Sequence, residues 1–250
     1  QFYGTPLGAV ARRIVANRVR ARWRRTEGLT IIGLGHAAPF LGSFQGQSYA
    51  VGALMPASQG ALVWPQNGRS RSAIVDEDQL PLADNSVDRL LVVHLLEGAG
   101  ARASILLREM WRVLKPEGRI LLIVPNRRGL WSRRDVTPFG HGQPYSRGQL
   151  ERLLQNAMLA PLDWGGALHV PPVDHPLFVR SATAFERVGS RFWPSFSGLL
   201  MVEARKETVA PLVEAVPQRR VRLLPVGLTA GAKRDRAETE NATRDRSYGA

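Results

Sequence analysis

The sequence predicts an α/β fold in which helices cover a mostly parallel β-sheet, and the stretch 76–124 carries this prediction. Residues 87–93 are mostly apolar, which is typical of a strand buried on both faces. Residues 103–114 then change to helical spacing, and residues 119–124 are apolar again. A strand, a helix and a strand within roughly forty residues form a βαβ unit, so the two strands should be parallel.

Within this unit, four residues should form the buried stripe of the helix: Ile105, Leu106, Met110 and Val113. The next four residues read Lys-Pro-Glu-Gly, at positions 115–118. Proline suits the second position of a type I turn and glycine the fourth, so a type I turn is expected there.

A basic helix is expected over 8–23, ahead of the first strand. Its inward residues should be Val10, Ile14, Val15, Val19 and Trp23. Arginines occupy its other face, so it could cover the domain or lie on a membrane surface or a partner; we favour the covering role, because the apolar face must be buried.

The other expected elements follow from apolar runs between turn residues. Strands are expected at 29–34, 49–54, 73–75, 162–170 and 199–204, and helices at 146–159 and 184–192. Ser146 is the expected N-cap of its helix, whose apolar stripe would be Leu150, Leu153 and Leu154.

Composition restricts the possible functions of the 250-residue chain. It has no cysteine, which excludes disulfides, thiolate nucleophiles and cysteine-ligated metals, and we expect no metal site and a cytoplasmic location. No apolar run approaches the roughly 20 residues that span a bilayer. The net charge of +13 could attract nucleic acid, anionic lipid or an acidic protein. Nucleic acid is the weakest of these, because no reading motif is present.

Two strings carry a family resemblance: LPLADNSVD at 80–88, and REMWRVLKPEGRILLIVPN at 108–126. They resemble the methyltransferase type 11 branch of the class I S-adenosyl-L-methionine (SAM)-dependent methyltransferases. The resemblance implies a Rossmann-like, seven-stranded, mostly parallel sheet with helices on both faces and an antiparallel C-terminal hairpin. It divides the chain into a basic helix (1–28), the methyltransferase-like domain (29–206) and a basic, largely disordered tail (207–250).

The resemblance implies SAM as cofactor and places its glycine-rich loop at Gly33, Gly35 and Ala37. Two departures accompany it. Ile31 stands where the family usually has an acid, and no acid ends the second strand, where a carboxylate normally binds the ribose hydroxyls. Gln59 or its neighbour Ser58 could supply a single weaker acceptor instead.

Three further residues would complete the cofactor site by resemblance. Asp76 would face the adenine amino group, with Glu77 in the same loop; the alternative for Asp76 is a carboxylate that caps its own loop. His94 opens the string His-Leu-Leu-Glu at 94–97, and the family often has a similar string that lines the methyl-transfer pocket. It is a weak candidate for a general base, because a packed wall residue would look the same.

The loop after the fifth strand should bind the methyl acceptor, because ligands of doubly wound sheets lie at the carboxyl ends of the strands. The candidate residues are Asn126, Arg127, Trp131, His141 and Tyr145. Arginines could hold an anionic group and aromatic rings a flat one. The alternative is a solvated basic loop whose aromatic residues pack on the sheet.

We therefore expect a methyltransferase that acts on an unidentified small molecule or protein. The alternative is a catalytically degenerate protein of this fold that serves as a regulatory or binding subunit. The missing acids motivate this alternative, and so does the aromatic connection over 171–197, which could form a lid or dock a protein partner.

Overall fold

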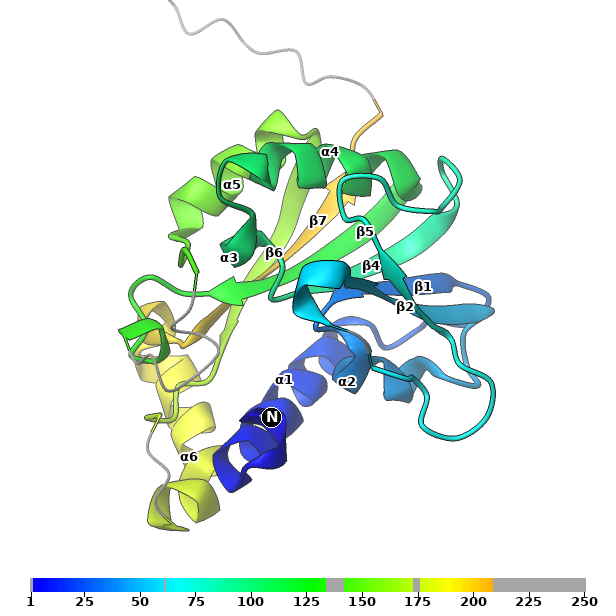
Figure 1. The fold of residues 1–250 in the computed structure, drawn as a ribbon. Coiled ribbons are helices and arrows are strands. Elements are labelled where there is room, and N and C mark those ends of the chain that lie inside the picture. Colours follow the sequence, from blue (N-terminus) through cyan, green and yellow to red (C-terminus); the bar gives the residue numbers. More distant parts are fainter. Residues whose placement is uncertain (1, 61, 134–141, 173–175, 209–250) are drawn as a thin grey trace, which may run out of the picture. The chain divides into compact units, whose positions relative to one another are not determined.

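The computed structural model describes residues 2–60, 62–133, 142–172 and 176–208. Residues 1–210 form one compact unit, built around a seven-stranded sheet in the order β3-β2-β1-β4-β5-β7-β6 (Figure 1). The strands are β1 Thr30–Gly35, β2 Ala50–Pro56, β3 Ser72–Val75, β4 Val87–Val93, β5 Leu114–Pro125, β6 Leu159–Ala167 and β7 Leu199–Lys206.

The first five strands are parallel to one another, and β7 runs antiparallel to both β5 and β6. The expected fold class, with its antiparallel C-terminal hairpin, is confirmed. From β1 the chain moves outward to β2 and β3 and then returns to place β4 on the other side of β1. The carboxyl ends of β1 and β4 therefore meet where the strand order reverses, the usual ligand position in such sheets.

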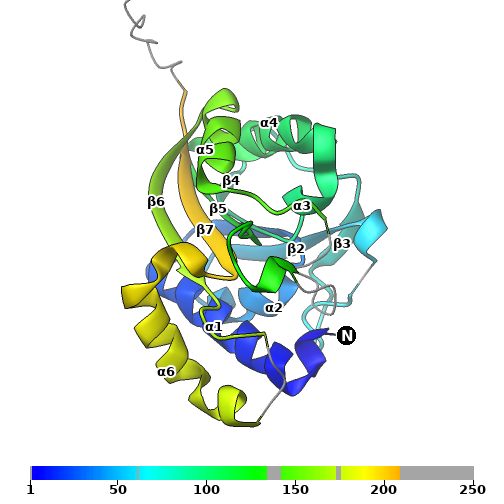
Figure 2. The same ribbon diagram turned by 90° about the vertical axis from the view of Figure 1, so that its left-hand side faces the viewer.

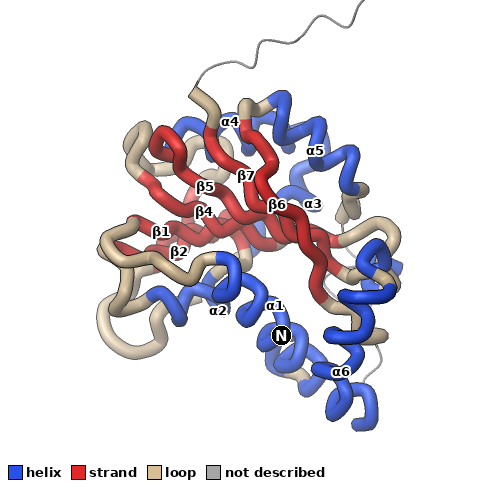
Figure 3. The backbone as a smooth tube through the Cα atoms, turned by 180° about the vertical axis from the view of Figure 1, so that it is seen from behind, coloured by secondary structure: helices blue, strands red, loops and turns tan. Residues whose placement is uncertain are grey.

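Helices cover both faces of the sheet (Figures 2 and 3). One face carries α1 Pro6–Arg22, α2 Ala38–Leu41 and α6 Pro176–Phe192, and the other α3 Leu96–Ala99, α4 Ala103–Val113 and α5 Arg147–Asn156. Strand residues alternate between the two layers. Leu91 and Val93 of β4 join the core beneath α1, whereas Leu90 and Val92 join the core beneath α4.

The stripe predicted for α4 is partly wrong, because Ile105 is 54% exposed. The buried residues are Ala103, Leu106, Leu107, Met110 and Val113. Their spacing of three and four keeps them on one face of the helix, and Ile105 falls outside that arc.

The type I turn predicted at 115–118 is also wrong. Glu117 has φ +62°, and both central residues of a type I turn need negative φ. The four residues form a bulge within β5, because Val87 pairs with Leu114 while Arg89 pairs with Arg119.

Helix boundaries differ from the expected ones by a few residues. α1 begins at Pro6, with Thr5 as N-cap, and buries Leu7 and Ala11 in addition to the expected Ile14, Val15 and Val19, whereas Val10 is only half-buried. Trp23 is buried just beyond the helix, where its indole N–H donates to Glu203 Oε1 at 3.0 Å. The buried face of α1 therefore packs on the sheet.

The C-terminal elements are also shifted. Ser146 caps α5 in a reciprocal capping box with Gln149, as expected for an N-cap. The helix ends at Asn156, because β6 already starts at Leu159, and α6 is longer than predicted. Nearly all of the expected tail 207–250 lies outside the described residues. Among the described helices, none combines the length and apolar character needed to cross a membrane.

Candidate functional site

The first candidate site feature is the glycine turn at the end of β1. Gly35 has φ +74°, and a Cβ atom there would lie 2.5 Å from the Val93 carbonyl oxygen. The next residue, His36, donates its backbone N–H to that same oxygen at 2.7 Å. Only glycine tolerates both this conformation and this contact, so Gly35 brings the ends of β1 and β4 together.

The two other predicted loop residues have packing roles. A Cβ atom at Gly33 would lie 2.7 Å from Leu41 Cδ1 and 2.8 Å from the Ala37 Cβ. Ala37 is itself fully buried immediately before α2. Gly33 and Ala37 thus allow α2 to pack closely on β1, which fixes the backbone that follows Gly35.

The end of β2 carries an amide in place of a carboxylate. The Gln59 side chain donates from Nε2 to the His94 carbonyl oxygen at 2.6 Å. It therefore bridges the end of β2 to the end of β4 across the glycine turn. Met55, near the end of β2, is buried, and its Sδ accepts a hydrogen bond from the Leu62 backbone N–H at 3.2 Å.

His94 is the centre of a polar cluster that we call the His94 cluster and define as Tyr3, His36, Gln59, His94 and Glu97. His94 has φ +53°, and its Nδ1 lies 2.6 Å from Glu97 Oε1. Its Nε2 lies 3.3 Å from the Tyr3 hydroxyl oxygen, and the Tyr3 ring stacks on His36 with 5.1 Å between centroids. The segment before α1 thus reaches the carboxyl edge of the sheet.

Burial determines the protonation states of two members of this cluster, Tyr3 and His36. Burial, with a further contribution from the Glu97 carboxylate, raises the pKa of Tyr3 above its ordinary value. Burial, with the adjacent His94, lowers the pKa of His36 to about 4. At neutral pH, Tyr3 is therefore a phenol and His36 a neutral imidazole. Glu97 Oε2 is buried and has no hydrogen-bond partner among the described residues.

Asp76 and Glu77 lie after the edge strand β3. Asp76 is exposed, and its Oδ1 accepts the backbone N–H of Asp78 at 3.0 Å, which is the loop-capping contact considered as the alternative. Glu77 and Asp78 both form ion pairs with Arg102, at 3.2 and 2.9 Å. These contacts order the loop at the carboxyl end of β3.

Two of the predicted acceptor residues are buried in the structure. Asn126 Nδ2 donates to the carbonyl oxygens of Ser195 and Ser197, at 3.1 and 2.8 Å. Trp131 is 1% exposed, and its indole N–H donates to the Val170 carbonyl oxygen at 2.7 Å. Trp131 therefore packs on the sheet, which is the alternative considered for the aromatic residues of this loop.

The remaining predicted acceptor residues differ in their positions. The buried Tyr145 donates its hydroxyl hydrogen to the Leu96 carbonyl oxygen at 3.0 Å, which places it beside Glu97. Burial, followed by the Glu97 carboxylate, raises the pKa of Tyr145. Arg127 is exposed and donates from Nε and Nη2 to the Pro144 carbonyl oxygen. His141 lies outside the described residues.

The structure thus brings Gly35, His94 and Glu97 together and adds Tyr3 and His36, to which the sequence assigned no role. Tyr3 is 91 positions away from His94, and no local pattern connects them. His36 follows the glycine turn directly, so its position was an available signal. None of the hydrogen bonds described above joins the His94 cluster to Asp76, Asn126 or Trp131.

Comparisons with known proteins agree with this architecture. The family model described as "Methyltransferase domain", of type 11, matches residues 42–122, which span β2 to most of β5 and exclude the glycine turn. A search of curated protein sequences finds no match.

Solved structures share the fold at low sequence identity. A SAM-dependent methyltransferase from Archaeoglobus fulgidus is 15% identical with a TM-score of 0.59, covering 82% of this chain and 96% of its own. A chain from the complex of the Haloferax volcanii Trm112 methyltransferase activator with a methyltransferase is 17% identical with a TM-score of 0.53, and the match covers 80% of this chain and 96% of that one. The (4+2) cyclase SpnF is 20% identical with a TM-score of 0.53, and the match covers 77% of this chain and 79% of SpnF.

These neighbours include different activities, so they establish the fold rather than the reaction. The family model adds a match to the type 11 methyltransferase domain over residues 42–122. This part of the chain therefore resembles that domain, and the chain as a whole has a Rossmann-like methyltransferase fold.

Proposed function

We propose that the protein is a SAM-dependent methyltransferase whose cofactor binds at the carboxyl ends of β1 and β4. The observation that carries this proposal is Gly35, whose positive φ and missing Cβ keep the backbone close to Val93. A glycine turn at this strand-order reversal is the feature that allows a backbone to approach a nucleoside cofactor.

The described residues fit SAM in part. Glu97 Oε2 is a buried acceptor without a partner among the described residues, so it could accept a hydrogen bond from an ammonium or hydroxyl group. Gln59 supplies an amide near the position of the usual ribose-binding carboxylate, and its Oε1 lies 3.5 Å from where a Gly35 Cβ would be. Asp76, which is exposed, would contact the adenine.

The reaction needs little dedicated chemistry from the protein. When bound, SAM supplies an electrophilic methyl group, and the protein must align the acceptor with it. His94 and Glu97 are coupled at 2.6 Å beside the glycine turn. We infer that this pair accepts the proton that an acceptor hydroxyl or amine releases. The acceptor is a small molecule or a protein side chain that reaches His94.

Calorimetric titration with SAM and with S-adenosylhomocysteine (SAH) tests the cofactor proposal. Asp76→Asn keeps the size of the side chain and removes its charge. It should weaken binding about tenfold, because a charge-assisted hydrogen bond to the adenine is lost. Glu27→Gln is the matched control, since Glu27 is an exposed acid that precedes β1 and lies at the opposite edge of the sheet.

Micromolar binding that only Asp76→Asn weakens would support the proposed site. Binding that both variants weaken equally would indicate general electrostatics and remove Asp76 from the site. A correctly folded chain that binds neither compound would overturn SAM binding by the isolated protein.

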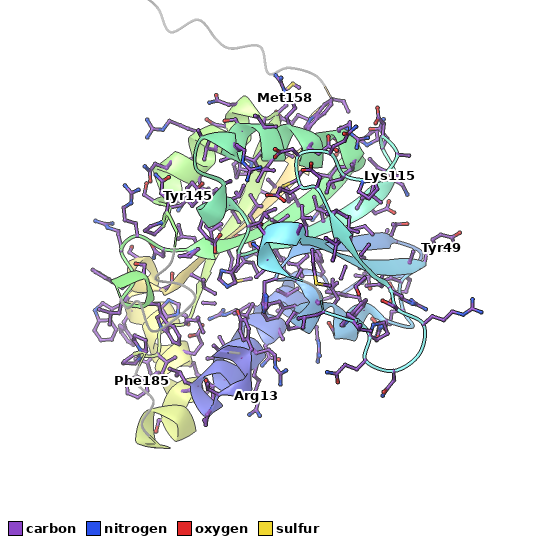
Figure 4. The ribbon with its side chains drawn as sticks, viewed as in Figure 1. Arg13, Tyr49, Lys115, Tyr145, Met158 and Phe185 are labelled. Carbon is purple, nitrogen blue, oxygen red and sulfur yellow. The ribbon has the colours of Figure 1, made fainter. Side chains whose placement is uncertain are left out.

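The second candidate function is that of a catalytically degenerate binding subunit, and an exposed apolar surface favours it. The surface lies on α6 and the following 3₁₀ helix Pro194–Phe196 and consists of Phe185, Val188, Phe192, Trp193 and Phe196. Phe192, Trp193 and Phe196 are 65%, 59% and 56% exposed. α6 and α1 cover the same sheet face, and Phe185 and Arg13 mark these helices in Figure 4.

We propose that this surface docks a protein partner, since aromatic residues are enriched at protein interfaces. A structural neighbour comes from a complex between the Haloferax volcanii Trm112 methyltransferase activator and a methyltransferase, so a protein partner has a precedent in another protein of this fold. Affinity capture with the wild type and with Phe192→Ser/Trp193→Ser tests the idea. A partner that the double variant loses would support docking here, whereas equal capture by both would overturn it.

A further inference from the structure

A separate cavity of about 590 Å³ lies between the start of α5 and the strands β6 and β7. We call it the arginine pocket. The lining residues that matter here are Arg127, Arg128, Arg147, Trp164, Gly166 and Leu200. None of them belongs to the His94 cluster, so the pocket is a second candidate site at the same end of the sheet.

The charged side chains that line the arginine pocket are all positive. Its lining includes three arginines and no aspartate or glutamate. None of these arginines takes part in an ion pair within the described part of the chain. The nearby Asp163 is paired with Arg22 of α1 at 2.8 Å. Within residues 2–60, 62–133, 142–172 and 176–208, no carboxylate therefore pairs with the arginines of the pocket.

Two of the guanidinium groups are held in place. Arg127 donates to the Pro144 carbonyl oxygen at 3.3 and 3.2 Å, which leaves its other N–H groups for a ligand. The Arg147 guanidinium carbon lies 4.8 Å from the centre of the Trp164 ring, in a cation–π contact. Such fixed guanidinium groups lose little conformational freedom on binding an anion.

The backbone around the pocket is also fixed. Asn126 bonds to the carbonyl oxygens of Ser195 and Ser197, which holds the end of β5 against the start of β7. A Cβ atom at Gly166 would lie 2.4 Å from Ser197 Oγ. The β6 backbone at Gly166 is therefore closer to Ser197 than a side chain at position 166 would allow. Trp164 and Leu200 supply the apolar part of the lining.

We propose that the arginine pocket binds a phosphorylated compound with a flat apolar body. The phosphate lies among the three guanidinium groups, which bind its oxygens in a bidentate manner, and the apolar body packs against Trp164 and Leu200. A dianionic phosphate fits better than a carboxylate, because three arginines carry more charge than one carboxylate neutralises. This binding does not depend on SAM.

Phenyl phosphate is the probe for this pocket, with inorganic phosphate, benzoate and phenol as partial probes. Binding to the full chain is followed through backbone amide and indole N–H resonances in a two-dimensional NMR titration. Arg147→Gln should weaken phenyl phosphate binding at least about fivefold, because it removes one guanidinium group. Arg108→Gln is the matched control, since Arg108 is an exposed arginine on α4 without an ion pair in the described residues.

The expected order of affinity is phenyl phosphate, then inorganic phosphate and benzoate, then phenol, with shifts at Arg147 and at the Trp164 indole. Equal weakening by Arg147→Gln and Arg108→Gln would overturn the proposal, because the net charge of +13 alone would then explain binding. Binding of phenol as tight as that of phenyl phosphate would also overturn it. SAH affinity should be unchanged in Arg147→Gln, which separates this test from that of the cofactor site.

Discussion

Two regions of the sheet's carboxyl edge, one at its centre and one toward β6, differ in how their polar groups are satisfied. At the ends of β1 and β4, the His94 cluster bonds largely to itself, and Tyr3 and Gln59 reach across the glycine turn. At the ends of β5 and β6, the arginine pocket keeps three guanidinium groups without carboxylate partners in the described residues. One region is closed by its own side chains, and the other is open and charged.

The two regions also differ in how they were identified: the family resemblance predicts a site at the first, whereas the second was found only in the structure. The closed region coincides with the position that the family resemblance assigns to the cofactor, yet Gln59 bridges where a carboxylate is usual. A ligand entering there must replace contacts that the protein already makes, which lowers its net affinity. The arginine pocket requires no such exchange. Four substitutions sharpen the comparison, in order of expected effect.

Gly35→Ala should have the largest effect, because it combines a left-handed backbone with a contact of 2.5 Å to the Val93 carbonyl oxygen. We expect a loss of about 4 kcal/mol in the free energy of unfolding. Gly46→Ala is the control, since Gly46 has φ +80° with no atom within 4 Å of an added Cβ. It should cost about 1 kcal/mol. Urea denaturation measures both, and equal losses would refute the close contact.

Asn126→Ala tests the wall of the arginine pocket. It leaves the carbonyl oxygens of Ser195 and Ser197 without this donor, so we expect a loss of about 3 kcal/mol in unfolding free energy. Asn17→Ala, at an exposed position of α1, should change stability by less than about 0.5 kcal/mol. A loss below about 1 kcal/mol for Asn126→Ala would show that these bonds do not hold the wall.

His36→Phe tests the electrostatics of the closed region. Burial lowers the pKa of His36 to about 4 in the folded protein, whereas the unfolded chain has a pKa of about 6.5. Protonation therefore favours unfolding, and this contribution to stability is complete above pH 6.5 and is lost as the pH falls towards 4. Between pH 7 and pH 5 the wild type should lose about 2 kcal/mol more than His36→Phe.

Urea titrations at pH 7 and pH 5 measure this difference. Phenylalanine retains a ring for stacking on Tyr3, and the neighbouring His94 is present in both proteins. Equal losses for wild type and variant would show that His36 is not held neutral by its surroundings.

Tyr3→Phe should have the smallest effect. It keeps the ring stacked on His36 and removes only the hydroxyl that lies 3.3 Å from His94 Nε2, so we expect a loss of about 1 kcal/mol. Tyr49→Phe is the control, because Tyr49 is 82% exposed. If thermal denaturation gave the same midpoint for both variants, the Tyr3–His94 contact would not stabilise the closed region.

The fold could be predicted from the sequence because apolar spacing records burial directly. The strand over 87–93 and the N-cap at Ser146 were predicted correctly for this reason. The type I turn failed at Glu117, since a non-glycine residue with positive φ leaves no local signal. The site was harder to predict from the sequence than the fold. Tyr3 reaches His94 only through the packing of α1, and Trp131 is an aromatic loop residue that packs into the core.

One NMR experiment tests most directly whether the carboxyl edge of the sheet holds two separate binding sites, the cofactor site and the arginine pocket. SAH and phenyl phosphate are titrated separately into the ¹⁵N-labelled full chain. We predict that SAH shifts the amide resonances of Gly35, His36 and His94, while phenyl phosphate shifts those of Arg147 and the Trp164 indole. Shifts at the same residues with both compounds, or no response of the glycine turn to SAH, would contradict the account.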